Sequence, residues 1–139
     1  MNNYAISIVV LITFSLTAAA QDIQTERVQF QRGASEATIN AKIKGYQSVN
    51  YLLDTQQGQS MEVVLNTDNA SNYFNIFAPG KKPGEDEAMF IGSTEGNRYA
   101  GTLPVNGDHS VQVFLMRNAA RRDETANYTL KIEIAPRAH

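Results

Sequence analysis

The chain has 139 residues, a formal net charge of −2 and no cysteine. That length fits one domain, and the charge gives no overall attraction to nucleic acid or to an anionic membrane. Without cysteine the chain can form neither disulfides nor thiolate metal sites. Any electrostatic recognition must therefore be local.

Residues 1–20 predict a secretory signal peptide. A polar opening is followed by an apolar run from Ala5 to Leu16 and then by three alanines before Gln21, which is the order of a leader and its cleavage site. The apolar run is shorter than the ~20 residues that span a bilayer. We therefore expect residues 21–139 to be exported as one domain that keeps no membrane attachment after cleavage.

The remaining sequence alternates apolar and polar side chains with the period of a β-strand. In the segment 60–66, Met61, Val63 and Leu65 fall on one face of a strand and the residues between them on the other. Segments 37–46 and 127–135 alternate in the same way. Shorter candidate strands lie at 28–30, 51–54, 73–77, 99–103 and 110–116, with glycine- and proline-containing turns between the segments.

Short strands separated by turns predict an all-β fold, a compact antiparallel β-sandwich of about eight strands. The sandwich should be almost free of helix after residue 20, although one helical turn near residues 118–122 is compatible with it. The side chains expected to share one core are Ile39, Val63, Val111, Val113, Leu130 and Ile132.

No arrangement of catalytic residues stands out. The two histidines, His109 and His139, are too few for a histidine-rich metal site, and no phosphate-binding glycine motif occurs. The sequence GDHS at 107–110 contains the residue types of a hydrolase triad, but neighbouring residues do not converge as a triad requires. A hairpin turn leading into a strand is the better interpretation. We predict no enzyme activity, no metal site and no cofactor.

Two local charge clusters remain. Residues 85–87 are Glu-Asp-Glu, which could offer oxygen ligands to calcium but lack the spacing of an EF-hand loop; a solvated acidic loop is favoured. The second cluster places Arg117, Arg121 and Arg122 between two predicted strands.

The spacing of the arginines indicates how they could act. Arg117 and Arg121 share a face both in a strand and in a helical turn, whereas Arg122 points elsewhere. Two neighbouring guanidinium groups suit a cluster of carboxylates on a partner, and Asn118 with two alanines keeps the segment slim. The alternative is that these charges only keep a hairpin soluble and pair with the acidic residues at 123–124.

Three segments carry a resemblance to a known family. They are KGYQSVNYLLDTQQGQ at 44–59, LPVNGDHSVQVFLMRNAAR at 103–121 and NYTLKIEI at 127–134. Over about residues 28–134 the chain resembles the periplasmic inhibitors of goose-type (g-type) lysozyme of Gram-negative bacteria. The resemblance implies an antiparallel β-sandwich with loops that enter the lysozyme active-site cleft. By motif position, the contacts implied are Tyr46, Arg117 and Arg121, with Asn118 beside them. No motif is matched between residues 80 and 100.

The resemblance implies a g-type lysozyme as protein partner, a periplasmic location, no enzyme activity and no cofactor. Arg117 and Arg121 would pair with acidic groups of the cleft, and Tyr46 would be an aromatic anchor. A second interpretation stays open, because the pattern is also similar to the prepeptidase C-terminal modules. In that case the chain would bind carbohydrate or cell wall, with Tyr46, Tyr51 and Tyr73 stacked on sugars.

Overall fold

The computed structural model describes residues 22–31 and 34–136, so the predicted signal peptide at 1–20 lies outside the described residues. Nine strands and two short helices occur in these two ranges. In chain order they are β1 Asp22–Arg27, β2 Glu36–Lys44, β3 Gln47–Thr55, β4 Ser60–Thr67, β5 Asn72–Phe77, β6 Phe90–Ile91, α1 Gly92–Glu95, β7 Arg98–Thr102, β8 Gly107–Leu115, α2 Arg117–Arg121 and β9 Thr125–Ala135.

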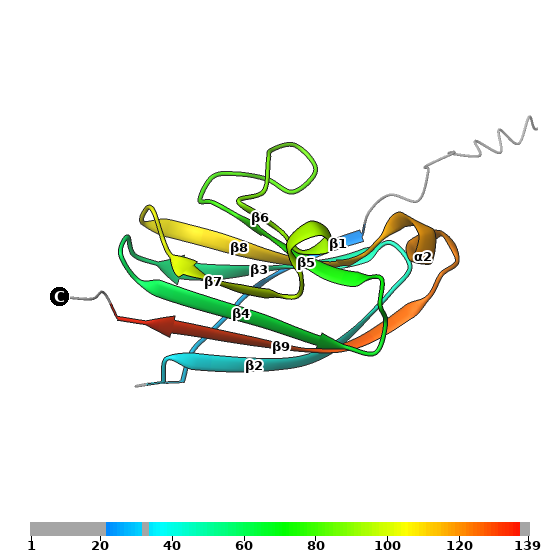
Figure 1. Cartoon of the computed structure of the whole chain (residues 1–139), viewed down its shortest axis with the longest axis horizontal. Coiled ribbons are helices and arrows are strands. Elements are labelled where there is room, and N and C mark those ends of the chain that lie inside the picture. The colour runs from blue at the N-terminus through cyan, green and yellow to red at the C-terminus, as the bar shows by residue number, and fades with distance from the viewer. Residues whose placement is uncertain (1–21, 32–33, 137–139) are drawn as a thin grey trace, which may run out of the picture.

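The strands form two sheets that pack face to face (Figure 1). One sheet has the order β1-β3-β8-β5-β6 and the other the order β2-β9-β4-β7. The predicted all-β sandwich is confirmed, with one difference: β1 pairs in parallel with β3, while the other pairings are antiparallel.

The strand expected at 28–30 is wrong, because the first strand comes earlier and ends at Arg27. One further backbone hydrogen bond, from Val28 N to Leu52 O at 2.9 Å, closes the ladder between β1 and β3. All six residues of β1 are exposed. An exposed strand has no buried face and so leaves no alternation in the sequence.

The core lies between the two sheets, on the faces that the alternation predicted. In β4, Met61, Val63 and Leu65 are buried and the intervening residues are half-buried. Of the six expected core residues, all but one are fully buried. The exception is Ile39, which is partly buried and packs against the core from β2, an edge strand of its sheet.

A buried pair of hydroxyl groups joins the two sheets. The hydroxyl oxygens of Tyr51 in β3 and Tyr128 in β9 lie 2.7 Å apart, and both residues are buried. Burial raises the pKa of both phenols above the usual value. Both therefore stay neutral, so that one donates a hydrogen bond to the other.

The two helices are single turns at the ends of strands. No helix within residues 22–31 and 34–136 is long and apolar enough to cross a membrane. Helix α2 connects β8 to β9 and carries two of the three arginines singled out in the sequence. The expectation of little helix, with a turn near residues 118–122, is met.

Candidate protein-binding surface

The turn between β2 and β3 holds Gly45 and Tyr46 against the connection between α2 and β9. Gly45 has a φ of +61°, a conformation that favours glycine. Its N–H donates to the carbonyl of Glu124 at 2.9 Å, and a Cβ at this position would lie 2.6 Å from Asp123 Oδ1. The positive φ therefore favours glycine here, and any larger residue would also have to displace the Asp123 side chain.

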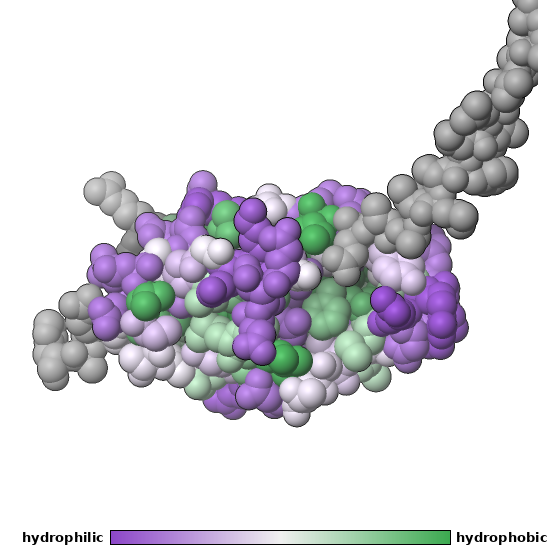
Figure 2. All heavy atoms as spheres, turned by 90° about the horizontal axis from the view of Figure 1, so that it is seen from above, coloured by the Kyte–Doolittle hydropathy of each residue, from purple (hydrophilic) through white to green (hydrophobic). Residues whose placement is uncertain are grey.

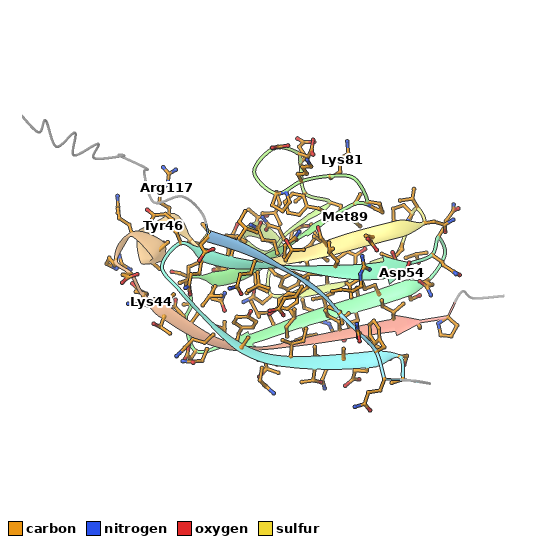
Figure 3. All side chains as sticks on the ribbon, turned by 180° about the vertical axis from the view of Figure 1, so that it is seen from behind. Lys44, Tyr46, Asp54, Lys81, Met89 and Arg117 are labelled. Carbon is orange, nitrogen blue, oxygen red and sulfur yellow. The ribbon has the colours of Figure 1, made fainter. Side chains whose placement is uncertain are left out.

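An ion pair joins the same two segments. Lys44 Nζ lies 2.9 Å from Asp123 Oδ2. The tripeptide Lys44-Gly45-Tyr46 and the arginine segment therefore share one end of the sandwich. Figure 3 shows Tyr46 and Arg117 together at that end and Asp54, the next-to-last residue of β3, at the other.

Helix α2 presents its polar residues outward because its alanines are buried. Ala119 and Ala120 are 0% and 3% exposed, and the N–H groups of both donate to the carbonyl of Met116 at 3.0 and 2.9 Å. Arg117, Asn118 and Arg121 are exposed. The sandwich thus holds the helix on its alanine side and leaves both arginines open to a partner.

The acidic residues next to the arginines already have other partners. Arg122 Nε donates to Glu124 Oε2 at 2.7 Å, and Asp123 is paired with Lys44. A hydrogen bond from Asn69, together with that from Arg122, lowers the pKa of the Glu124 carboxyl.

Arg117 and Arg121 differ from Arg122 in this respect. Within the described ranges, neither of their side chains has a hydrogen bond or an ion pair, whereas Arg122 is paired. The alternative interpretation, in which these arginines pair with residues 123–124, thus holds for Arg122 alone. The donors of the other two guanidinium groups have no partner among the described residues.

Tyr46 is half-buried and packs against the edge of the core. Its hydroxyl makes no hydrogen bond within the part of the chain that the structure describes, so it can donate to an acceptor outside the molecule. The ring is fixed while its polar tip is available, which is the arrangement of an interface anchor.

A groove beside Tyr46 was not predicted from the sequence. It has a volume of about 390 Å³ and runs over the outer face of the five-stranded sheet, under the loop that joins β5 to β6. Its lining residues are Gly45 to Ser48, Asn75, Phe77, Gly84, Asp86 to Ala88, Ile91, Gln112, Phe114 and Leu115. Part of the segment 80–100, for which no motif was matched, therefore lines the same groove as the tyrosine.

The residues at 107–110 do not form a hydrolase triad. They belong to strand β8 rather than to a turn, so the interpretation as a turn is wrong. His109 is fully buried and its Nδ1 lies 2.7 Å from Thr55 Oγ1, while Asp108 accepts two hydrogen bonds from Arg27. No group of three or more histidine and acidic residues able to hold a metal ion occurs in residues 22–31 and 34–136.

The sugar-stacking interpretation loses one of its three tyrosines. Tyr51 is 2% exposed and lies between the sheets, where no ligand can stack on it. Tyr46 and Tyr73 are half-buried. The set of three aromatic platforms expected for a carbohydrate-binding module is therefore not present.

Comparison with known proteins shows the family. No family model matches the chain. It is 28% identical to an inhibitor of g-type lysozyme from Escherichia coli, over 94% of this chain and 93% of that protein. The crystal structure of PliG from Aeromonas hydrophila, described as a periplasmic inhibitor of g-type lysozyme, has 36% identity and a TM-score of 0.75, covering 81% of this chain and 97% of that one.

PliG from Salmonella Typhimurium has 25% identity and a TM-score of 0.59, and the aligned part covers 80% of this chain and 97% of that one. The two PliG proteins are described as periplasmic inhibitors of g-type lysozyme and the Escherichia coli protein as an inhibitor of g-type lysozyme, in agreement with the resemblance found in the sequence. The identity to the Aeromonas protein extends over almost the whole of that structure. The chain belongs to the family of periplasmic inhibitors of g-type lysozyme.

Proposed function

We propose that the chain inhibits a g-type lysozyme by placing Arg117, Arg121 and Tyr46 in the active-site cleft, with Asn118 at its edge. The observation that carries the proposal is the pairing of charges at this end of the sandwich. The two neighbouring carboxylates are taken by Lys44 and Arg122. The other two arginines stay available for carboxylates of the enzyme.

The mechanism is occlusion, and it needs no chemistry from the inhibitor. A lysozyme cleft contains acidic groups that act on the glycan, so guanidinium groups inserted there would pair with them in a site that excludes water. Tyr46 would fill adjacent space and donate its hydroxyl to an acceptor of the cleft. The substrate could then not enter.

The surface is organised before binding, which favours affinity. Buried alanines hold α2 and a backbone hydrogen bond fixes the Gly45 turn. Little conformational entropy is then lost on association beyond that of the two arginine side chains. Inhibition should accordingly need no rearrangement of the backbone.

A lysis assay tests this proposal. The protein starting at Gln21 is expected to suppress clearing of a bacterial suspension by a g-type lysozyme, and Tyr46→Ala should weaken the suppression because the anchor is lost. Tyr46→Phe keeps the ring but removes the hydroxyl, and its inhibition should lie between that of the parent and that of Tyr46→Ala. If the parent protein binds isolated peptidoglycan but leaves the lysozyme active, the proposal is wrong and the cell-wall-binding function takes its place.

A further inference from the structure

The groove beside Tyr46 has features that the proposed arginine contacts do not use. Its floor is polar: Ser48 and Gln112 are 3% and 7% exposed and both line the groove. The Nε2 of Gln112 lies 3.5 Å from Ser48 Oγ. In the described residues, no donor reaches Gln112 Oε1. Among the described residues, this oxygen is not one of the buried side-chain atoms without a partner, so it is accessible and can accept a hydrogen bond from a group that enters the groove.

The wall formed by the loop between β5 and β6 is acidic. Asp86 and Glu87 line the groove, whereas Glu85 beside them does not. Asp86 Oδ2 accepts a hydrogen bond from the backbone N–H of Lys82 at 2.8 Å, which holds the loop. The carboxylate of Glu87 has no ion pair or hydrogen bond within residues 22–31 and 34–136.

The lysines of this loop do not neutralise the groove. Neither Lys81 nor Lys82 lines it, and Figure 3 shows Lys81 at the outer end of the loop, away from Tyr46. The remaining lining includes the apolar side chains of Phe77, Ile91 and Phe114. Figure 2, which looks onto this face, shows apolar residues open to the surface between hydrophilic ones.

From these features we infer that the groove receives a cationic side chain, arginine or lysine, from the surface of the same lysozyme that the arginines engage. This inference rests on the proposed function. Carboxylates and the Gln112 oxygen supply acceptors for a guanidinium or ammonium group, while the apolar wall covers its aliphatic stem.

The position of the groove adds a reason. Tyr46 belongs both to the arginine surface and to the groove, so a partner that covers the tyrosine also covers the groove mouth. The inhibitor would then present positive charge at α2 and negative charge at the loop. Two charges of opposite sign fix the orientation of a partner better than one.

Binding of Glu87→Gln to a g-type lysozyme, measured by titration calorimetry at physiological salt, tests the inference. We expect about tenfold weaker binding, because Glu87, which is exposed in the free protein, would lose its charge pair with the lysozyme. Glu85→Gln is the matched control, since it removes the same charge two residues away and outside the groove, and it should bind nearly as the parent does.

A second pair of variants adds a large cationic side chain instead of removing a negative charge. Ile91 is 41% exposed and lines the groove, while Met89 is 36% exposed and does not. Ile91→Arg should place a guanidinium next to the acidic wall and weaken binding more than Met89→Arg does. Thermal unfolding of both variants checks that they fold.

Several outcomes would overturn the inference. Parent-like binding by Glu87→Gln would refute the groove contact, as would equal weakening by Glu85→Gln and Glu87→Gln. If Arg117→Ala still loses binding, the proposed function survives this failure; if Arg117→Ala binds as the parent does, the proposed function itself fails. Binding of a peptidoglycan disaccharide in the groove, seen as shifts of the Gln112 amide signals without lysozyme, would identify a sugar site instead.

Discussion

The two ends of the sandwich treat their charges differently. At the end that holds the start of β8, Arg27 and Asp108 form two hydrogen bonds of 3.0 and 2.8 Å with each other. At the other end, Arg117 and Arg121 are exposed and, among the described residues, unpaired. A charge with an internal partner is used by the fold itself, whereas an unpaired one remains available to a partner.

The pKa values agree with this comparison. The Arg27 guanidinium lowers the pKa of the Asp108 carboxyl and is itself made harder to deprotonate. Both groups are solvent-exposed, so the pair contributes little to stability. Its effect is to connect β1 to β8 and to pair the Arg27 guanidinium within the fold.

The largest difference between the two ends is expected when arginines are replaced by residues of opposite charge. Arg117→Glu combined with Arg121→Glu is expected to weaken inhibition of a g-type lysozyme by about 100-fold or more, because like charges would meet in the cleft. Arg27→Glu, at the other end, should leave inhibition unchanged. Lysis assays over a range of inhibitor concentrations measure both, and equal losses from the two ends would contradict the comparison.

Gly45→Ala tests whether the close approach of the turn matters. The left-handed backbone should cost about 1–2 kcal/mol of stability, and the new Cβ must also displace Asp123 from 2.6 Å. Inhibition should weaken as well, because Tyr46 moves. Gly80→Ala is the control: Gly80 has a φ of +81° but no atom within 4 Å of its Cβ. If both variants lose the same stability in denaturant unfolding and both inhibit fully, the turn plays no special part.

His109 predicts a pH dependence of stability at the other end. Burial lowers its pKa below the ordinary 6.5, and its Nε2 is buried with no hydrogen-bond partner in the part of the chain that the structure describes. The unfolded chain therefore takes up a proton more readily, so stability is full above about pH 6.5 and falls as the pH drops toward the lower folded value. As the pH is lowered from about 7.5 to about 5.5, the melting temperature of the parent should fall, whereas that of His109→Gln should change less. Identical profiles would show that His109 does not contribute.

The smallest effect is expected from Arg122→Ala. This arginine is paired with Glu124 and lies outside the predicted contact pair. Removing it should change neither inhibition nor melting temperature measurably, since exposed pairs contribute little. A loss of inhibition as large as that from Arg121→Ala would mean that the whole arginine cluster acts as a diffuse positive field.

Sequence patterns predicted most of the fold because most strands bury one face. The alternation in β2, β4 and β9 gave both the strands and their inner residues. Strand β1 was placed wrongly because it is exposed throughout, and β6, with two residues, is too short to produce a pattern.

The site was predictable only in part. Residue types and the resemblance pointed to Tyr46, Arg117 and Arg121, and a glycine beside the tyrosine was the available sign of a tight turn. The pairing of Lys44 with Asp123 depends on how β2 and β9 pair, which no local pattern encodes. The groove could not be predicted from the sequence, because Ser48 and Gln112 occupy outward positions of their strands and are nevertheless buried beside a loop.

The most direct test of the central claim is a calorimetric titration of a g-type lysozyme with Arg117→Ala and Arg121→Ala, together with the unfolding free energy of each free variant. We expect each substitution to reduce the binding free energy by about 2 to 5 kcal/mol and to change stability by no more than about 0.5 kcal/mol. Parent-like binding by either variant, or a loss of stability as large as the loss of binding, would contradict the claim that these arginines are held open for a partner.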